Sequence, residues 1–354
     1  MKKVQVLIVD DSAVIRNILR SGLARDPRLE VIGTAKDAYQ ARDVIVKKKP
    51  DIITLDLGMP RMNGLEFIQV LMEHWPLPII VISSIADSSR EASLKALELG
   101  AVDIFPKPKP EDSSNRNKVM AQLADLLFYS ARAKVKGGKA RAVASVAQQV
   151  AVAPAPGLAP LRGVIASEKV IVIGASTGGT EAIRKVLENM PAGAPGIVMV
   201  QHMPEGFTQS FADRLNQICP NLMVREARNG DTVESGVALL APGNQHMLLR
   251  KHGSRYFVEV KGGPPVNRHR PSVDVIFHSA AECAGKNAIG VILTGMGADG
   301  ALGLLAMKEA GGRTIAQDEE SCVVYGMPRE AVENGSVEKI LPIQQITQGV
   351  LRFL

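Results

Sequence analysis

The stretch VIVIGASTGGTEAIRKVL, residues 170–187, decides the fold of this chain. Its first five residues form a hydrophobic run of strand length, and its second half has the apolar spacing of an amphipathic helix. The two halves are joined by a turn, GASTGG (174–179), which satisfies the pattern G-x-S-x-G and contains Ser176. This pattern places a serine on a sharp strand-to-helix turn. The stretch therefore predicts a buried strand, a turn that exposes the serine, and a helix whose N-terminus points at it.

Two further hydrophobic runs end in the same way. GIVMV (196–200) is followed by QHMP with His202, and AIGVIL (288–293) is followed by TGMGADG with Asp299. Parallel strands present their carboxyl ends at one edge of a sheet, where the ligand sites of open α/β sheets lie. Ser176, His202 and Asp299 are therefore expected to meet there as nucleophile, general base and the carboxylate that orients the base. The three motifs predict the site of a serine hydrolase.

Other interpretations of these residues stay open from the motifs alone. Ser176 or Thr177 could cap the following helix, and the glycine turn could hold a phosphate, although no Walker lysine follows it. Asp299 could cap the apolar helix that begins after it, and His246 is a rival to His202. The chain order Ser, His, Asp also differs from the order Ser, Asp/Glu, His of α/β-hydrolases. A triad in this order implies a different scaffold.

The bulk composition is that of two ordinary globular domains. A length of 354 residues favours two domains, and 46% hydrophobic residues can supply both cores. No apolar run reaches the roughly 18 residues of a membrane span, and the first residues lack a cleavable signal pattern. The three cysteines, Cys219, Cys283 and Cys322, have no spacing typical of zinc sites or disulfides. We expect a cytoplasmic protein that does not insert into membranes.

The net charge of +6 is concentrated in one segment. Residues 131–143 contain five basic residues and no acid, and the rest of the chain is close to neutral. Aromatic residues make up only 4%, and no recognition-helix pattern is present. We therefore expect no binding to nucleic acid and interpret the basic segment as a solvated linker.

The chain is predicted to be an α/β protein with two doubly wound, mainly parallel-sheet domains. In residues 1–128, strand-like runs alternate with amphipathic segments, which favours a parallel sheet. Residues 129–166 are rich in Ala, Pro, Gly and Lys without periodicity, and are predicted to be a flexible basic linker. Strand and helix signals resume in residues 167–354 and continue to the C-terminus.

Acidic residues gather at the strand ends of the first domain. Asp10 and Asp11 end the first strand, Asp56 ends IITLDL, and Lys107 follows the last strand. Three carboxylates in one crevice suit Mg²⁺, which prefers oxygen ligands. Asp56 is then placed to become an aspartyl phosphate. The separate alternatives are that Asp11 or Ser12 caps the helix beginning near Ala13, and that Asp56 and Lys107 are ordinary turn residues.

The order DD…D-x-x-M-P…SS…K-P resembles the response-regulator receiver domain over about residues 4–124, whose fold is flavodoxin-like. The resemblance implies that Asp56 is the phospho-acceptor and that Asp10, Asp11 and Asp56 form the Mg²⁺ pocket. It further implies a switch hydroxyl, a switch aromatic and a phosphate-sensing lysine, which are Ser83, Phe105 and Lys107. Lys109 is a second candidate for that lysine. Gly58 stands where relatives often carry a larger or acidic residue, which leaves the pocket more open.

The second domain resembles the catalytic domain of the CheB family of chemotaxis protein-glutamate methylesterases over about residues 168–350. The matching motifs are GASTGGTEA, VQHMP, LAPGNQHM, RPSVD (270–274), LTGMGADG and AQDEESCVVYGMP. The resemblance implies Ser176 as nucleophile, His202 as base and Asp299 as its orienter. Thr177 and Met296 match positions that line the site, and the Met296 N–H is an oxyanion donor candidate. The resemblance also implies that the ester hydrolysis needs no cofactor.

The resemblance also implies substrate, partners and regulation. The substrate is the glutamyl methyl ester on the cytoplasmic helices of methyl-accepting chemoreceptors, methanol is released, and receptor glutamines are deamidated. A chemotaxis histidine kinase supplies the phosphoryl group, and the unmodified receiver covers the catalytic cleft. Two alternatives remain: a receiver joined to a binding module without turnover, and a receiver joined to a hydrolase of a small soluble ester.

Overall fold

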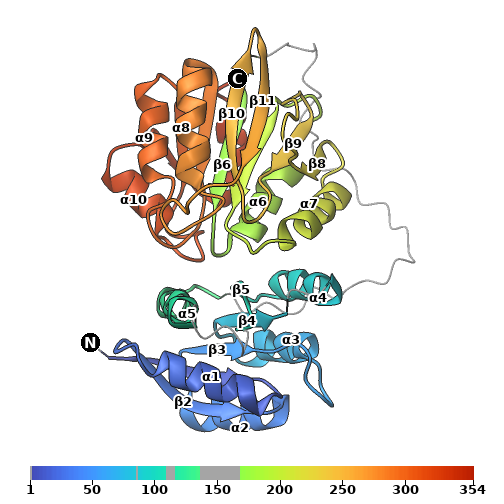
Figure 1. The fold of residues 1–354 in the computed structure, drawn as a ribbon, viewed down its shortest axis with the longest axis vertical. Coiled ribbons are helices and arrows are strands. Elements are labelled where there is room, and N and C mark those ends of the chain that lie inside the picture. The colour runs from blue at the N-terminus through green and yellow to red at the C-terminus, as the bar shows by residue number, and fades with distance from the viewer. Residues whose placement is uncertain (1, 85–86, 109–115, 136–167) are drawn as a thin grey trace.

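The computed structural model describes residues 2–84, 87–108, 116–135 and 168–354. They form two lobes, one stacked on the other (Figure 1). The predicted linker, 129–166, lies mostly outside the described residues, as do three of the five basic residues of 131–143. Its first residues continue the receiver lobe, because the last helix of that lobe ends at Ser130 and a turn follows.

The N-terminal lobe is a five-stranded parallel sheet in the order β2-β1-β3-β4-β5. This order is that of flavodoxin-like folds. The strands are β1 (Val4–Val9), β2 (Leu29–Ala35), β3 (Ile52–Leu55), β4 (Ile79–Ser83) and β5 (Asp103–Pro106). The helices are α1 (Ala13–Leu23), α2 (Ala38–Lys48), α3 (Gly64–His74), α4 (Asp87–Glu98) and α5 (Arg116–Ser130).

Two apolar clusters sandwich this sheet. Side chains of α1 and α5 pack on one face, and side chains of α2, α3 and α4 pack on the other. The helix starts follow local chemistry, since Ser12, Asp37 and Asn63 each accept a backbone N–H of the first turn they precede. The capping role considered for Ser12 is thus confirmed, with Ser12 Oγ 3.4 Å from the Ile15 nitrogen.

The C-terminal lobe is a seven-stranded sheet in the order β14-β13-β12-β6-β7-β9-β8, and every pairing in it is parallel. Its strands are β6 (Val170–Ala175), β7 (Ile197–Gln201), β8 (Met223–Glu226), β9 (Val237–Leu240), β12 (Ala288–Ile292), β13 (Arg313–Gln317) and β14 (Lys339–Leu341). The expectation of two doubly wound, mainly parallel α/β domains is confirmed.

Helices cover both faces of the larger sheet. α6 (Gly179–Glu188), α7 (Phe207–Ile218) and α11 (Ile346–Leu351) pack on one face. α8 (Val273–Ala284), α9 (Ala301–Glu309) and α10 (Met327–Glu333) pack on the other, beside an antiparallel hairpin of β10 (His246–His252) and β11 (Arg255–Lys261). The hairpin and the direct passage from β8 to β9 interrupt the strand–helix alternation that the sequence predicted to continue unbroken.

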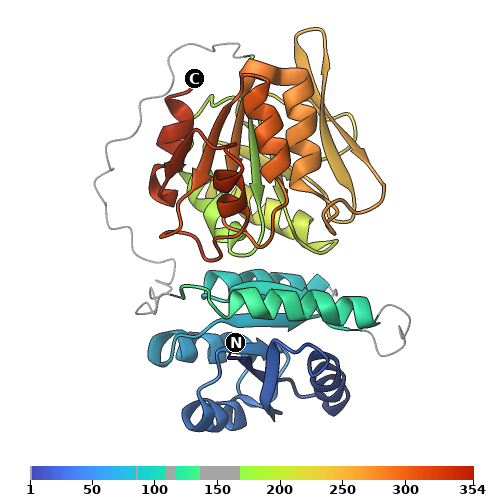
Figure 2. The same ribbon diagram turned by 90° about the vertical axis from the view of Figure 1, so that its left-hand side faces the viewer.

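The two lobes contact each other through the receiver's β5 edge and helices α4 and α5 (Figures 1 and 2). Glu98 of α4 pairs with Arg214 of α7 at 2.9 Å, and Asp125 of α5 pairs with Arg268 at 3.3 Å. Phe207 of the catalytic lobe packs among the apolar side chains of the receiver. This places the receiver against the sheet edge that carries Ser176.

Among the described residues, none of the helices has the length and apolar character of a membrane span.

Candidate active site

Ser176 and His202 follow two paired strands in matched register. Ala175 of β6 lies opposite Gln201 of β7, and the His202 nitrogen donates to the Ala175 carbonyl at 3.1 Å. On the other side, the Ser176 nitrogen donates at 3.0 Å to the carbonyl of Thr294, which begins the TGMGADG turn after β12. Because β12, β6 and β7 are neighbours, the three predicted strands do end at one edge. The sequence prediction of a shared edge is confirmed.

His202 and Asp299 are in direct contact. His202 Nε2 lies 2.8 Å from Asp299 Oδ2. The other ring nitrogen, Nδ1, is buried and has no hydrogen-bond partner. Ser176 Oγ forms no hydrogen bond to it within the described residues, although catalytic hydrogen bonds are often long before substrate binds. The His202 ring is therefore held through Nε2 by Asp299, while its Nδ1 has no hydrogen-bond partner among the described residues.

The Asp299 carboxylate accepts hydrogen bonds from several groups besides His202. The side chains of Asn267 and Ser272 donate to Oδ1 at 2.8 and 2.7 Å, and the Val273 and Asp274 backbone N–H groups donate at 2.6 and 3.2 Å. Burial raises the pKa of Asp299, but the hydrogen bond and charge of His202 and the bonds from Asn267 and Ser272 outweigh it and hold the pKa far below its usual value. Asp299 therefore stays ionised opposite the imidazole.

Asp299 lies at the start of helix α8 and not at the start of α9, the helix that follows it in the sequence. The two backbone N–H groups that it accepts belong to the first turn of α8, where the helix dipole favours a negative charge. Helix α9, which follows Asp299 in sequence, is preceded by Gly300 and has no side-chain cap. The alternative that Asp299 caps α9 is wrong.

The turn after Ser176 depends on glycine. Gly178 has φ +77°, a left-handed conformation, and caps α6 without any side-chain hydrogen bond. The alternative that Ser176 or Thr177 caps this helix is therefore wrong. Gly295 lies so close that a Cβ on it would be 2.8 Å from the Ser176 Cβ. Close approach of the two turns thus requires glycine at this position.

Thr177 and Met296 lie where the two lobes meet. Thr177 Oγ1 donates at 2.7 Å to Asp103 Oδ2 of the receiver strand β5. Met296 is half-buried and lines a cavity of about 380 Å³, together with Tyr325 and, from the receiver side, Tyr129 and Arg132. Thr177 directly follows Ser176, and Met296 directly follows Gly295, which approaches Ser176; the receiver therefore reaches the neighbourhood of Ser176.

The other histidines lie in different environments. His269 stacks on His202 with ring centroids 3.7 Å apart and planes at 7°. Burial and the neighbouring His202 lower the pKa of His269 to about 3, so its ring is neutral. His246 is on the β10–β11 hairpin, where its Nε2 lies 3.0 Å from the Pro264 carbonyl. Among the described residues, His246 forms no hydrogen bond or ring contact with Ser176, His202 or Asp299, whereas His269 stacks directly on the predicted base.

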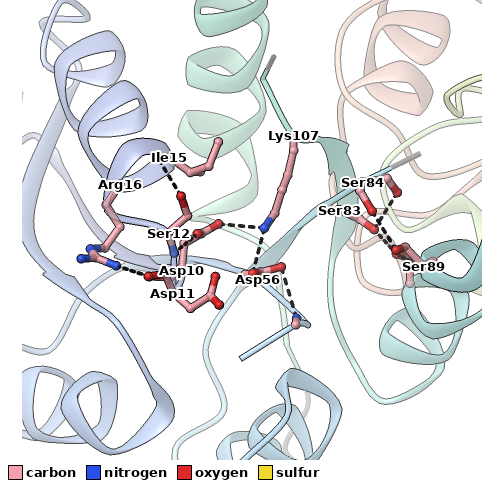
Figure 3. Close-up of polar contacts among 12 residues, drawn as sticks. Asp10, Asp11, Ser12, Ile15, Arg16, Asp56, Ser83, Ser84, Ser89 and Lys107 are labelled. Atoms are coloured by element: carbon pink, nitrogen blue, oxygen red, sulfur yellow. Dashed lines mark hydrogen bonds and ion pairs between the residues drawn. The ribbon is translucent and has the colours of Figure 1, made fainter. Parts of the chain in front are cut away.

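The receiver pocket has the geometry of a cation site. Carboxylate oxygens of Asp10, Asp11 and Asp56 all lie within 4.8 Å of one another. Lys107 Nζ points between Asp56 and Asp10 at 2.8 and 3.2 Å (Figure 3). Asp10 Oδ2 is buried with Lys107 as its ion-pair partner, and burial followed by the charge of Asp56 raises the pKa of Asp10. Hard oxygen ligands with surplus negative charge fit Mg²⁺.

Ser83 and Phe105, the remaining predicted switch residues, form no hydrogen bond with Asp56 in the described part of the chain. Ser83 Oγ accepts from Ser93 Oγ at 2.7 Å and donates to the Ser84 carbonyl, so its hydroxyl is turned toward α4 (Figure 3). Phe105 is buried in the cluster under α1 and α5. A Cβ at Gly58 would lie 3.7 Å from Asp56 Oδ2, so this position adjoins the acceptor. Lys109 lies outside the described residues.

Several site residues were not found from the sequence. Gln201 Nε2 holds the carbonyls of Ser176 and His202, at 2.9 and 3.0 Å. Asn267, His269 and Asp103 contact the triad or its neighbour Thr177, and none of them ends a strand. Ser272 lies in the RPSVD motif (270–274), which carries the family resemblance but predicts no role for this serine. Asn267, His269 and Ser272 lie in loops and Asp103 lies on the other lobe, which strand-end reasoning does not reach, whereas Gln201 ends β7 directly before His202.

Comparison with known families and proteins agrees with this geometry. Residues 171–350 match the CheB methylesterase family, and residues 6–116 match the response regulator receiver domain. The chain is 49% identical to the protein-glutamate methylesterase/protein-glutamine glutaminase 2 of Syntrophus aciditrophicus, with 100% of both chains covered. It is 48% identical to the protein of Thiobacillus denitrificans named protein-glutamate methylesterase/protein-glutamine glutaminase, covering 99% of this chain and 97% of that one.

A solved structure supports the same assignment for the second lobe. The crystal structure of the CheB methylesterase catalytic domain of Thermotoga maritima matches with a TM-score of 0.51 and 40% identity, over 52% of this chain and 98% of that chain. The full-length relatives, the two family matches and the strand-end site agree, and the chain belongs to the CheB methylesterase family, with a response-regulator receiver domain in front of the catalytic domain.

Proposed function

We propose that this chain is a protein-glutamate methylesterase and protein-glutamine glutaminase in which Ser176, His202 and Asp299 form the catalytic triad. The chain is a carboxylic ester hydrolase that demethylates and deamidates chemoreceptors in chemotactic adaptation, under control of receiver phosphorylation. The observation that carries the assignment of residues is the His202–Asp299 contact of 2.8 Å beside Ser176, with one buried imidazole nitrogen unpartnered.

The proposed reaction uses the free nitrogen of His202. Ser176 Oγ attacks the γ-carbonyl carbon of the glutamyl ester while its proton passes to His202 Nδ1. That proton then leaves with methanol, or with ammonia when the substrate is glutamine. Water, deprotonated by the same nitrogen, attacks the acyl-serine carbonyl; the bond from that carbon to Ser176 Oγ breaks, the imidazolium returns its proton to Oγ, and the glutamate carboxylate is released. Asp299 stabilises the imidazolium in both halves because it remains ionised.

The oxyanion is proposed to be held by backbone N–H groups at the turns. Thr177, directly after the nucleophile, and Met296, in the turn beside it, supply candidate groups. The dipole of helix α6, whose first residue is Gly179, favours negative charge at the same place. One such donor is typically worth about 10²–10³-fold in rate.

Methanol release from a methylated chemoreceptor tests the assignment. Ser176→Ala is expected to abolish release, and Ser235→Ala, which removes a surface hydroxyl bonded to the Gly193 carbonyl, is the matched control. Normal turnover by Ser176→Ala would overturn the nucleophile. Turnover of small soluble esters but not of methylated receptor would favour a receiver joined to a hydrolase of a small soluble ester. Binding of the receptor without any methanol release would favour a receiver joined to a binding module.

The receiver is proposed to be phosphorylated on Asp56 by a chemotaxis histidine kinase. Asp10, Asp11 and Asp56 would hold Mg²⁺, which would neutralise the charge of the incoming phosphoryl group. Lys107, now paired with Asp56 and Asp10, would pair with the phosphate, and Ser83 and Phe105 would respond as the switch. A cytoplasmic location and chemoreceptor helices as substrate are part of the same proposal.

The unphosphorylated receiver is proposed to inhibit the esterase by covering it. The hydrogen bond from Thr177, next to the nucleophile, to Asp103 of the receiver supports this. A truncated protein starting near residue 165 is expected to be active without phosphorylation. Equal activity of the truncated and the unphosphorylated full-length protein would contradict the inhibition. The end of the receiver domain at residue 128 and the start of the catalytic domain at residue 167 are part of the same proposal.

A further inference from the structure

Asn267 joins the catalytic carboxylate to a second buried carboxylate. Its Nδ2 donates at 2.8 Å to Asp299 Oδ1 and at 2.6 Å to Asp274 Oδ2. Since both oxygens bond one nitrogen, they are at most about 5.4 Å apart. A single amide group therefore bridges two acids, and one of them is the residue that orients His202.

The second carboxylate has its own fixed position. Asp274 is 4% exposed, and its Oδ1 accepts the Gly303 backbone N–H at 2.6 Å. Burial, and then the charge of Asp299, raises the pKa of Asp274, while the hydrogen bond from Asn267 lowers it. The two acids thus repel each other, and the two N–H bonds of Asn267 offset that repulsion.

The backbone around Asn267 is built for this contact. Val266 and His269 pair with each other through reciprocal backbone hydrogen bonds of 3.0 and 2.8 Å. The two residues between them, Asn267 and Arg268, have φ of +50° and +68°. Such left-handed conformations cost free energy for residues other than glycine, although asparagine tolerates them best. The same tight turn places His269 on the ring of His202.

We propose that Asn267 is a positioning residue of the catalytic triad: its amide clamps the carboxylate of Asp299 between Asp274 and His202 and so fixes the imidazole. Asn267 does not touch the reacting atoms. Without its two N–H groups, Asp299 turns away from Asp274, and the His202 ring loses its fixed orientation. The kinetic part of this inference rests on the proposed function.

Two variants of the full-length protein separate the amide from the turn. Asn267→Gly keeps the left-handed backbone and removes the side chain. Asn267→Asp keeps the size and the backbone tolerance, but replaces the two N–H donors by a third carboxylate. We expect kcat for methanol release from methylated chemoreceptor to fall about 10- to 100-fold in Asn267→Gly, with KM nearly unchanged, and to fall at least as far in Asn267→Asp.

The matched controls are Asn244→Gly and Asn244→Asp. Asn244 is also a left-handed asparagine, with φ +63°, but its side chain bonds Glu205 and Arg270 and neither His202 nor Asp299. Both controls are expected to keep kcat within about twofold of the wild type. A role of residue 267 in the shape of the turn alone would leave Asn267→Asp as active as the wild type, which would overturn the proposal.

A spectroscopic measurement tests the clamp without substrate. The proton shared by His202 Nε2 and Asp299 is expected as a low-field ¹H resonance that disappears in His202→Ala. It should shift or broaden in both Asn267 variants and stay in place in both Asn244 variants and in Ser176→Ala. An unchanged resonance in the Asn267 variants would refute the clamp, whereas a failure of the nucleophile assignment would leave this result intact.

Discussion

Replacement of Asp103 by asparagine is expected to tighten inhibition by the receiver, although it removes a charged partner of Thr177. Asp103 is partly buried at the lobe interface, where its Oδ2 accepts from Thr177 Oγ1 and its Oδ1 from the Ile104 N–H at 2.7 and 2.8 Å. Burial nevertheless raises the pKa of Asp103 from 3.8 to about 6, because these bonds and the charge of His202 do not offset the loss of solvation. An ionised Asp103 therefore opposes closure.

The magnitude follows from that pKa difference. Separation of the lobes returns Asp103 to water and a pKa near 3.8, so at pH 7.5 the charge costs the closed form about 3 kcal/mol, at about 1.36 kcal/mol per pH unit. Asparagine avoids this cost, but burying its N–H groups costs about 1–1.5 kcal/mol. The net gain of about 1.5 kcal/mol predicts roughly tenfold lower activity of unphosphorylated Asp103→Asn.

The sign of the pH dependence follows from the same residue. The pKa of Asp103 is higher in the closed form, so the closed form binds the extra proton and gains stability as pH falls through about 6 toward 4. Above about pH 6 the cost of the charge is constant. The closed form of the wild type should therefore be favoured roughly tenfold more at pH 5 than at pH 7, and Asp103→Asn should lack this dependence.

The assay is methanol release from methylated chemoreceptor by the unphosphorylated full-length protein, divided by release by residues 165–354. This ratio cancels the pH dependence of the triad itself. The wild-type ratio should fall as the pH falls from 7 to 5, and the Asp103→Asn ratio should be lower at pH 7.5 and flat. A higher ratio for Asp103→Asn, or a wild-type ratio that does not change with pH, would refute this reasoning.

Three other predictions test separate parts of the structure. Chelation of divalent cations should prevent phosphorylation of Asp56 by a small phosphodonor and leave methanol release by residues 165–354 unchanged; an effect on that release would contradict a cofactor-free esterase. Gly58→Glu places a carboxylate next to Asp56, since a Cβ there lies 3.7 Å from Oδ2, and should slow phosphorylation severalfold at limiting Mg²⁺, measured as phosphate incorporation. Gln201→Leu leaves the carbonyls of Ser176 and His202 without their buried donor and should lower the free energy of unfolding, measured with denaturant, by about 2–3 kcal/mol. A loss below about 0.5 kcal/mol would contradict the two hydrogen bonds from Gln201 Nε2 to these carbonyls.

The sheets and the meeting of three polar motifs could be predicted because strand-end logic is local. A hydrophobic run predicts its strand, and a polar residue directly after it is carried to the common edge. Ser176 and His202 follow this rule, as do Asp10, Asp56 and Lys107, and Asp299 lies further along the turn that follows β12. Strands β6 and β7 end at paired residues, Ala175 and Gln201, and this pairing alone brings Ser176 next to His202.

The contacts that fix the triad depend on tertiary packing. Asn267 reaches Asp299 through a turn with two left-handed residues, and no periodic pattern marks such a turn. Asp299 accepts the first backbone N–H groups of α8, which precedes it in the chain by many residues, so the alternative that it caps α9 named the wrong helix. Asp103 approaches Thr177 only because the lobes pack together, and that arrangement is not encoded in either segment alone.

A serine-directed phosphonate reacts with a serine that is activated as a nucleophile. With the receiver phosphorylated, we expect one adduct per chain on the peptide containing Ser176, and loss of methanol release in proportion to the labelled fraction. Labelling should be absent in Ser176→Ala and strongly slowed in His202→Ala. An adduct on another residue, or full methanol release after complete labelling of Ser176, would contradict a nucleophile activated by the His202–Asp299 pair.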